Sequence, residues 1–270
     1  MNKSTLLAFL NEIGATPRKE LSQNFLINSS AICQIADLAE ISPSDWVLEI
    51  GAGAGAITQE LLARGAQVLA IEKDPTYAHH LERMQTEDQR LHIRCCDFLQ
   101  FPLNALQAMS PTWKVVSNLP YQITAPILEM LCDHASYFTS ATLVVQKEVG
   151  DRICAKPHTK IMGSLTIFVQ FYAGFAGSFP ISSSCFYPKP AVESMGLRLN
   201  FKHTKPPIDP LLFFPIVRKA YQQRRKMLTT SLKTVCPTLG AILITLGLSP
   251  KVRPEELTLE NWIALIKAIV

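Results

Sequence analysis

Short apolar runs alternate along the chain with segments in which apolar residues are spaced three and four apart. The wider spacing, as in Ile32, Ile35 and Ala36, predicts helices that bury one face. Strands that alternate with helices predict an open α/β sheet, in which ligands bind at the carboxyl ends of the strands. The apolar runs that predict buried strands lie at 46–50, 68–71, 91–96, 115–116 and 141–146.

Glycines follow the strand predicted at 46–50 without a break. Gly51, Gly53 and Gly55 stand at the turn into the next helix, where the absence of side chains lets the backbone approach a nucleotide. The following strand ends in Glu72, 21 positions after Gly51. A carboxylate at that spacing suits the two hydroxyls of a ribose, so we predict a Rossmann-like nucleotide site.

The glycine loop departs from the fingerprint of NAD-binding proteins. Ala56 occupies the position of the third glycine in that fingerprint, and Glu49 lies just ahead of the loop. Both features favour S-adenosylmethionine over NAD, because a methionine carboxylate and ammonium must be held instead of a pyrophosphate.

The third predicted strand ends in Asp97, which Phe98 follows. The carboxylate can accept a hydrogen bond from the exocyclic amine of an adenine while the ring lies against the face of the base. A solvated aspartate at the end of a strand is the alternative. Because Asp97 ends its strand as Glu72 does, we favour the role in ligand binding.

The strand at 115–116 leads into Asn118, Leu119, Pro120 and Tyr121. The amide of Asn118 offers both an acceptor and donors. Pro120 fixes its own φ and favours an extended Leu119, so that backbone carbonyls point into the cleft. With the ring of Tyr121 for stacking, the segment suits a planar base that carries an amine. A strand followed by an ordinary proline turn is the alternative.

Two other segments carry aromatic residues beside polar or proline residues. Gln23 and Asn24 precede Phe25 and Leu26 at the start of a predicted helix, which they could simply cap. Farther along, a proline-stiffened loop contains Phe186 and Tyr187. These two rings are either part of the core, or one of them faces the cleft and stacks on a substrate base opposite Tyr121.

The composition changes after the prolines at 206, 207 and 210. Helical patterns cover 211–235, 239–246 and 255–269. Residues 201–233 contain eight lysines or arginines and one acid, although the whole chain has a formal net charge of only +4. A solvated helix face usually mixes its signs, so this cluster indicates binding to an RNA backbone. The candidate RNA-binding residues are Arg218, Lys219, Arg224, Arg225 and Lys226.

Several classes of protein are disfavoured by what the chain lacks. Its seven cysteines include no Cys-x-x-Cys pair, and its histidines lack the spacing of metal ligands, so we expect neither a disulfide framework nor a metal site. No apolar run approaches the ~18 residues of a membrane span. We therefore expect a protein of the reducing cytoplasm with no membrane partner.

In this order, the motifs resemble those of the bacterial small-subunit ribosomal RNA adenine dimethyltransferases, the kasugamycin-resistance methylase group. The resemblance implies a seven-stranded, Rossmann-like class I methyltransferase sheet at 1–203, with a cofactor lid at 1–45, and a small helical RNA-binding domain at 204–270. The motifs that carry it are Gln23-Asn24-Phe25-Leu26, Glu49-Ile50-Gly51-x-Gly53-x-Gly55, Glu72, Asp97, Asn118-Leu119-Pro120-Tyr121, Phe186-x-Pro188-x-Pro190-x-Val192-x-Ser194 and Arg224-Arg225-Lys226.

The resemblance also implies a reaction and its partners. Methyl groups would pass from S-adenosylmethionine to N6 of two adjacent adenosines in the 3′-terminal hairpin of 16S ribosomal RNA, two to each. The substrate would be the 30S subunit or its late precursor, and the enzyme a monomer. Residues expected to bind the cofactor are Gln23, Asn24, Leu26, Gly51, Gly53, Glu72, Asp97, Phe98 and Asn118; those expected at the reacting base are Asn118, Leu119, Pro120, Tyr121 and Phe186.

Two positions depart from the family's pattern. Ser22 stands where glycine is usual, and Asn28 where aspartate is common. The resemblance therefore does not imply a backbone conformation for the lid at these two positions. Three other functions share parts of the pattern: a large-subunit adenine methylase of the macrolide-resistance type, a non-catalytic assembly or transcription factor, and a DNA adenine methylase. The basic tail favours the small-subunit enzyme over the first and leaves little room for the sequence-reading domain of the third.

Overall fold

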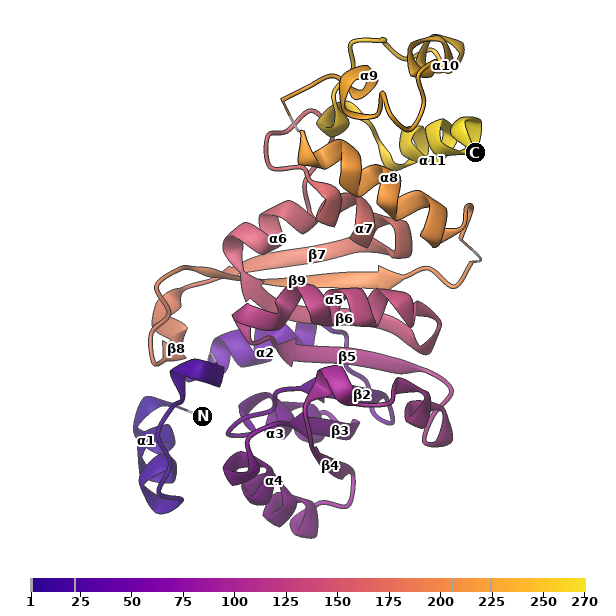
Figure 1. The fold of residues 1–270 in the computed structure, drawn as a ribbon. Coiled ribbons are helices and arrows are strands. Elements are labelled where there is room, and N and C mark those ends of the chain that lie inside the picture. The colour runs from indigo at the N-terminus through magenta and orange to yellow at the C-terminus, as the bar shows by residue number, and fades with distance from the viewer. Residues whose placement is uncertain (1, 22, 205, 224) are drawn as a thin grey trace. The chain divides into compact units, whose positions relative to one another are not determined.

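A seven-stranded sheet forms the centre of the computed structural model, which describes residues 2–21, 23–204, 206–223 and 225–270. The strand order is β4-β3-β2-β5-β6-β9-β7 (Figure 1). Strands β4, β3, β2, β5 and β6 are parallel, and β9 runs antiparallel to β6. The strands are β2 (Trp46–Ile50), β3 (Gln67–Glu72), β4 (Leu91–Cys95), β5 (Trp113–Asn118), β6 (Phe138–Gln146), β7 (Ala173–Ile181) and β9 (Ser194–Phe201).

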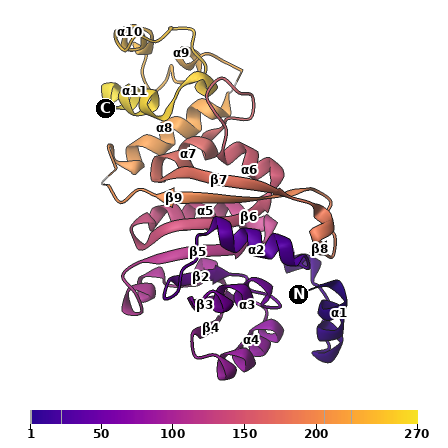
Figure 2. The same ribbon diagram turned by 180° about the vertical axis from the view of Figure 1, so that it is seen from behind.

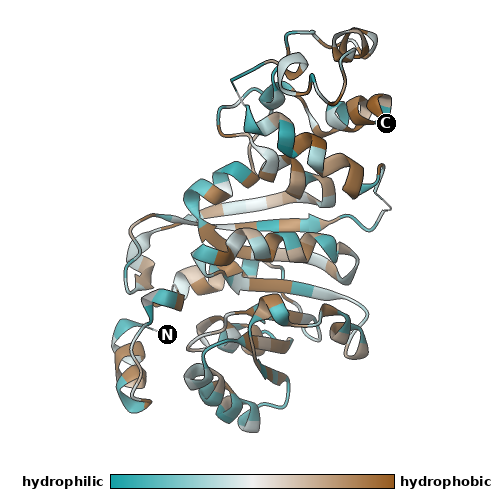
Figure 3. Cartoon of the chain, viewed as in Figure 1, coloured by the Kyte–Doolittle hydropathy of each residue, from teal (hydrophilic) through white to brown (hydrophobic). Residues whose placement is uncertain are grey.

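The register brings the ends of the parallel strands to one edge of the sheet. Ile50 pairs with Ile71, Glu72 pairs with Cys95, and Asn118 pairs with Val144. The strands predicted from apolar runs are therefore present, and the open α/β sheet is confirmed. Strands β2 and β3 are mostly hydrophobic along their length (Figure 3), as expected of parallel strands that are covered on both faces.

Helices cover both faces of this sheet. Helix α5 (Thr124–Asp133) lies over one face and α2 (Ser29–Leu38) over the other (Figures 1 and 2). Ile35 of α2 is fully buried in one cluster with Val116 and Val144 of the sheet; burial of such a side chain stabilises the fold by roughly 1.5–3 kcal/mol. The other helices around the sheet are α1 (Lys3–Glu12), α3 (Ala56–Ala63) and α4 (Pro75–Glu87).

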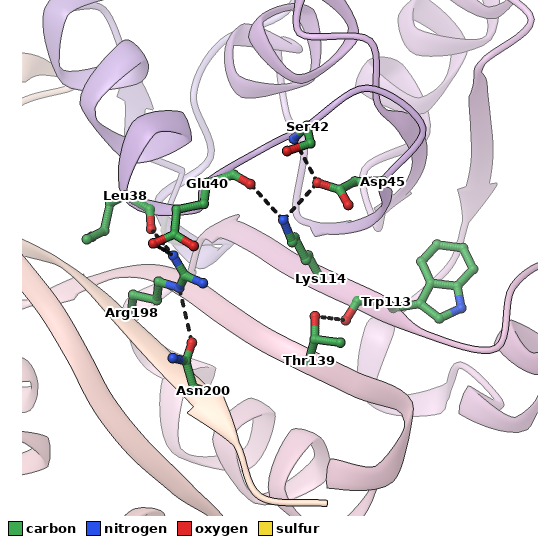
Figure 4. A network of polar contacts seen from close by, with 9 residues as sticks. All are labelled: Leu38, Glu40, Ser42, Asp45, Trp113, Lys114, Thr139, Arg198 and Asn200. Atoms are coloured by element: carbon green, nitrogen blue, oxygen red, sulfur yellow. Dashed lines mark hydrogen bonds and ion pairs between the residues drawn. The ribbon is translucent and has the colours of Figure 1, made fainter.

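Two cations fasten the end of α2 to the sheet at the edge opposite the strand ends described above. Arg198 on β9 donates to the Leu38 carbonyl at 3.1 Å and pairs with Glu40. Lys114 on β5 donates to the Glu40 carbonyl at 2.7 Å and to Asp45 at 2.8 Å. Figure 4 shows this network. Each cation also pairs with a carboxylate, Arg198 with Glu40 and Lys114 with Asp45. Together these contacts hold the α2–β2 connection against the sheet.

A second small sheet joins the N-terminal segment to the proline-stiffened loop. Strand β1 (Phe25–Leu26) is antiparallel to β8 (Phe186–Tyr187), with Leu26 opposite Phe186. The Ile27 amide donates to the Cys185 carbonyl at 2.8 Å and extends the pairing. Asn28, one of the two departures from the family's pattern, caps α2 by accepting from the Ala31 amide at 2.9 Å. An aspartate would cap in the same way; Ser22 lies outside the described residues.

The chain divides into two compact units, one of residues 1–150 and 174–202, the other of 151–173 and 203–270. The division expected at 203/204 lies one residue from the observed boundary at 202/203, but residues 151–173 group with the C-terminal helices and not with the first unit. The first division falls within helix α6 (Lys147–Ile153). The second unit contains α7 (Ser164–Tyr172), α8 (Pro210–Gln222), α9 (Leu228–Ser231), α10 (Leu239–Thr245) and α11 (Leu259–Ile269).

Aromatic packing explains why α7 belongs with the C-terminal helices. The ring centroids of Phe168 and Phe214 are 4.8 Å apart, as are those of Phe171 and Phe213. Aromatic pairs at such distances stabilise by about 0.5–1.5 kcal/mol beyond the burial of their area. The partners are too distant in sequence for their pairing to be read from periodicity.

One local prediction differs from the structure, and one strand was not predicted. The helix expected over 211–235 is broken, because α8 ends at Gln222 and the Leu228 amide bonds to the Val252 carbonyl at 2.9 Å instead of continuing the helix. The sequence does not predict strand β7, since Gly174, Gly177 and Pro180 are of types depleted in strands. Its position at the edge of the sheet tolerates a proline.

Candidate active site

A cavity of about 290 Å³ lies at the strand-end edge of the sheet. Its walls come from the N-terminal segment, the glycine loop and the ends of β3, β4 and β5. The first unit supplies all of these elements. The cavity brings together every residue that the sequence predicted for cofactor binding: Gln23, Asn24, Leu26, Gly51, Gly53, Glu72, Asp97, Phe98 and Asn118.

Gly53 occupies a position that another residue would strain. Its φ is +54°, in the left-handed region, and a Cβ atom there would lie 2.9 Å from Cε1 of Phe25. Its amide donates to the carboxylate of Glu72 at 2.7 Å. The glycine therefore lets the loop pass under the Phe25 ring while its backbone holds an acidic side chain.

Glu72 is fixed by two backbone donors at the end of β3. One carboxylate oxygen accepts from the Gly53 amide at 2.7 Å and the other from the Asp74 amide at 2.8 Å. Burial raises the pKa of Glu72, and these two hydrogen bonds oppose the rise by favouring the charged form. Its orientation is thus set before any ligand is present.

Glu49 is the second buried acid beside the cavity, only 2 % exposed. Burial raises the pKa of Glu49 to about 8, although Thr58 donates a hydrogen bond to the carboxyl at 2.7 Å. At neutral pH this group is mostly protonated. A cationic group of a ligand beside it would favour the ionised form, which suits the ammonium of a methionine moiety.

Asp97 has a partner that the motifs did not reveal. Lys73, which follows Glu72 and also lines the cavity, donates to one Asp97 oxygen at 2.8 Å. That hydrogen bond lowers the pKa of Asp97. The other oxygen accepts from the Leu99 amide at 3.0 Å, so the carboxylate is ionised and held in one orientation. The only signal for Lys73 in the sequence is its position directly after the ribose-binding candidate.

Asn118 is the last residue of β5, and its side-chain amide is oriented by the N-terminal segment. Nδ2 donates to the Asn24 carbonyl at 2.8 Å. The carbonyl can only accept, so the nitrogen must face it and Oδ1 must face away. The acceptor end of this amide is therefore the one presented to a ligand donor.

The residues after Asn118 form a tight turn. Pro120 has a φ of −60°, the value that its ring fixes, and a ψ of 121°, and its carbonyl accepts from the Ile123 amide at 3.1 Å and from Thr124 Oγ1 at 3.3 Å. The Leu119 amide bonds to the Val144 carbonyl at 3.1 Å. The Leu119 carbonyl is thus the better candidate for a backbone acceptor, because that of Pro120 is engaged by its own turn.

The structure does not bring Phe186 to the cavity. Its side chain is 2 % exposed and belongs to the hydrophobic cluster that contains Leu26, its partner across β1 and β8. The stacking role expected of this ring is therefore not supported, and the alternative of a core residue holds. Tyr121 does line the cavity.

Asp74 is another residue that motif reading missed. It is 2 % exposed and caps α4 by accepting from the Thr76 amide at 3.0 Å. Its second oxygen accepts from Gln23 Nε2 at 3.1 Å and lies 3.5 Å from the Arg18 guanidinium. The N-terminal segment is thus fastened over the cavity by side chains as well as by β1.

The basic residues of the tail belong to the second unit. Arg218, Arg225 and Lys226 are exposed, the latter two in the turn after α8. Lys219 is half-buried and donates to Thr234 Oγ1 at 2.7 Å. Arg224 lies outside the described residues. Within the described ranges no helix has the length and apolarity needed to cross a membrane, and no group of three or more side chains is arranged to hold a metal ion.

Known proteins resemble the chain over nearly its whole length. The sequence profile of a family described as ribosomal RNA adenine dimethylase matches residues 14–270. A protein of Protochlamydia amoebophila named ribosomal RNA small subunit methyltransferase A is 42% identical over 97% of this chain and 94% of its own. A Chlamydia trachomatis protein of the same name is 38% identical over 96% of this chain and 95% of its own.

Two solved structures share the fold. A dimethyladenosine transferase from Plasmodium falciparum superposes with a TM-score of 0.75, at 22% identity, over 89% of this chain and 95% of that one. The 23S rRNA methyltransferase ErmE superposes with a TM-score of 0.69, at 26% identity, over 91% of this chain and 99% of that one. The expected Rossmann-like class I methyltransferase fold is confirmed.

Proposed function

Because the chain belongs to the ribosomal RNA adenine dimethylase family, we propose that it dimethylates N6 of two adjacent adenosines in the 3′-terminal hairpin loop of 16S ribosomal RNA. The methyl donor is S-adenosylmethionine. The small subunit is chosen because relatives at 42% and 38% identity carry that substrate in their names. The likeness to ErmE makes a large-subunit RNA the second candidate.

The orientation of the Asn118 amide is the observation that carries the proposal. Its nitrogen is held by the Asn24 carbonyl at 2.8 Å, so Oδ1 is presented as an acceptor. An adenine amine has two N–H donors. The Asn118 oxygen and the Leu119 carbonyl are two acceptors at the end of one strand that can take them both.

The cavity residues fit S-adenosylmethionine. Glu72, already oriented by the Gly53 amide, would bind the ribose hydroxyls, and Asp97 and Phe98 would hold the adenine. Glu49, which lines the cavity and precedes the glycine loop in the sequence, would favour an ammonium. When bound, the cofactor supplies an electrophilic methyl group on a sulfonium. Gln23, Asn24 and Leu26 would cover it, since they line the cavity from the N-terminal segment.

The residues of the chain would activate the amine by orienting it. The N6 lone pair of adenine is delocalised into the ring, which makes the nitrogen a poor nucleophile. Acceptance of both N–H groups by Asn118 and Leu119 favours a pyramidal nitrogen whose lone pair points away from the ring. The proton becomes acidic only once the nitrogen is cationic, so water can take it and no strong base is required. Proximity and orientation carry most of the rate.

The target base must leave its stack to reach the cavity. Tyr121 would stack on the flipped-out adenine, a contact of about 1–3 kcal/mol per base. Arg218, Lys219, Arg224, Arg225 and Lys226 would bind the RNA backbone of the 30S subunit or its late precursor, with one copy of the chain acting on each particle.

The test is methyl transfer to defined particles. Tritium-labelled S-adenosylmethionine is supplied with 30S particles that lack adenine dimethylation, and with 50S particles and DNA in parallel. We expect label as N6,N6-dimethyladenosine in 30S RNA alone. Label in 50S RNA would support the second candidate, and label in DNA would contradict both. Binding of the cofactor without transfer to any particle would mean that the substrate is another assembly intermediate, and failure to bind the cofactor as well would leave a non-catalytic factor.

A further inference from the structure

A short, partly buried hydrogen bond joins two motifs through residues that lie 73 positions apart. The hydroxyl oxygens of Tyr121 and Ser194 are 2.6 Å apart, and either can be the donor. Ser194 is 0% exposed and begins β9, whereas Tyr121 lines the cavity and begins a short 3-10 helix, Tyr121–Ile123. Nothing in the proposed chemistry so far uses Ser194.

The bond crosses the end of a strand at the edge where the cavity lies. Strand β6 separates β5 from β9 in the sheet. Ser194 pairs with Gln146, the last residue of β6. The Tyr121 side chain thus reaches over the end of β6 to the first residue of β9. This geometry depends on the sheet order and not on any local sequence.

The backbone around Ser194 is itself held in place. The Glu193 carboxylate accepts from the Ser183 amide at 2.8 Å and from the Ser183 hydroxyl at 3.0 Å. The Glu193 carbonyl accepts from the Lys147 amide at 2.9 Å. The Ser194 hydroxyl is therefore presented from a backbone with little freedom, which makes it a fixed anchor for the phenol.

We propose that Ser194 is a positioning residue, which holds the ring of Tyr121 in the orientation that stacks on the target adenine. The inference rests on the proposed function. A ring held at its Cβ and at its hydroxyl has its position and long axis set before RNA binds, so less conformational entropy is lost when the base stacks. Phe186 lies in the core and cannot stack on the base from the other side. Stacking therefore depends on Tyr121 alone of these two rings, and so on how Tyr121 is held.

If Ser194 positions Tyr121, its loss should lower the efficiency of methyl transfer to RNA and leave binding of the cofactor unchanged. Removal of either hydroxyl frees the Tyr121 ring, and a net hydrogen bond of the usual strength corresponds to a loss of about three- to tenfold. We expect that loss in kcat/KM for the RNA particle, while the Kd for S-adenosylmethionine changes by less than about twofold.

A double-mutant cycle tests the link. Ser194→Ala, Tyr121→Phe and the double variant are compared with the wild type in kcat and KM on the unmethylated 30S particle and in Kd for the cofactor. Tyr121→Phe keeps the ring and removes only the hydroxyl. Ser110→Ala is the matched control, because Ser110 is also buried and bonds to the Thr112 carbonyl at 2.9 Å but does not line the cavity.

The expected result is that each single variant loses about three- to tenfold and that the double variant loses no more than either one. Equal losses from Ser194→Ala in the wild-type background and in the Tyr121→Phe background would overturn the proposal, since the serine would then act through the fold alone. Unchanged kinetics in Ser194→Ala would overturn it as well. A wild-type protein that methylates no ribosomal particle would instead contradict the proposed function.

Discussion

Asn118 Nδ2 lies 2.8 Å from the carbonyl oxygen of Asn24. This single hydrogen bond connects the end of a central strand with the N-terminal segment that covers the cavity. The same amide is thus proposed to have two roles. Its nitrogen holds the N-terminal segment over the cofactor, and its oxygen accepts a hydrogen bond from the substrate amine. Substitutions at this position should separate the two effects.

We expect Asn118→Ala to lower methyl transfer on the order of 100-fold, because an acceptor used in the transition state is lost. Asn118→Asp keeps an acceptor but places a carboxylate against the Asn24 carbonyl, so it should weaken cofactor binding more than the alanine variant does. Single-turnover rates and the Kd for S-adenosylmethionine measure the two effects. Wild-type transfer by Asn118→Ala would rule out the amine clamp.

Gly53→Ala should weaken cofactor binding and destabilise the fold by roughly 1–3 kcal/mol. The φ of +54° disfavours a side chain, and the added methyl group would meet the Phe25 ring. Thermal unfolding and cofactor titration provide the measurement. Gly174→Ala is the control, since among the described residues no atom beyond its chain neighbours lies within 4 Å of its Cβ position; an equal loss in that variant would show that the effect is not specific to the loop.

Glu49→Gln should change how stability depends on pH. The pKa of Glu49 is raised by burial to about 8, so the folded state prefers the protonated acid. The contribution of Glu49 to the free energy of unfolding is fully present below the pKa that Glu49 has in the unfolded chain. It is lost as pH rises toward 8, by up to about 1.4 kcal/mol per pH unit. Glutamine stays neutral, so the variant should gain stability relative to the wild type between pH 5 and pH 8.

Unfolding in denaturant at several pH values measures that gain. Glu87→Gln, at an exposed position on α4, is the matched control and should show no such trend. A constant difference between Glu49→Gln and the wild type across the pH range would mean that Glu49 is ionised in the folded protein.

Lys73→Met should shift the acid limb of cofactor binding to higher pH. The Lys73 ammonium lowers the pKa of Asp97, and a carboxylate with a depressed pKa keeps its ionised form until the pH falls through that value. Without the lysine, Asp97 would protonate at higher pH and become a weaker acceptor there. The effect should be small because the lysine is exposed, and Lys73→Arg should retain most of the wild-type profile. Titration of the Kd against pH is the measurement; superimposable profiles would exclude the coupling.

Arg225→Ala and Lys226→Ala should each weaken binding to the 30S particle and reduce the slope of log K against log salt by about 0.7–0.9. Both residues are exposed in the turn after α8, where they can approach a phosphate. Filter binding between about 50 and 200 mM salt would measure the slope. Lys267→Ala, at an exposed lysine of α11, serves as the control, and an equal change there would indicate only a general charge effect.

The sequence by itself determined the α/β fold, the strand ends and the candidate residues of the cavity. The reason is local: apolar runs mark buried strands, and parallel strands bring their carboxyl ends to one edge. Residues such as Gly53, Glu72, Asp97 and Asn118, which follow or end those runs, therefore had to meet. Their order along the chain was enough to identify the family.

The tertiary structure alone decided which way individual side chains face and which distant residues pair. The pairing of β1 with β8 turns Phe186 into the core, and the order of β5, β6 and β9 places Ser194 under Tyr121. Lys73 and Asp74 gain their roles from neighbours on other segments. Such contacts depend on register and on packing between remote elements, and a pattern along the chain carries no information about either.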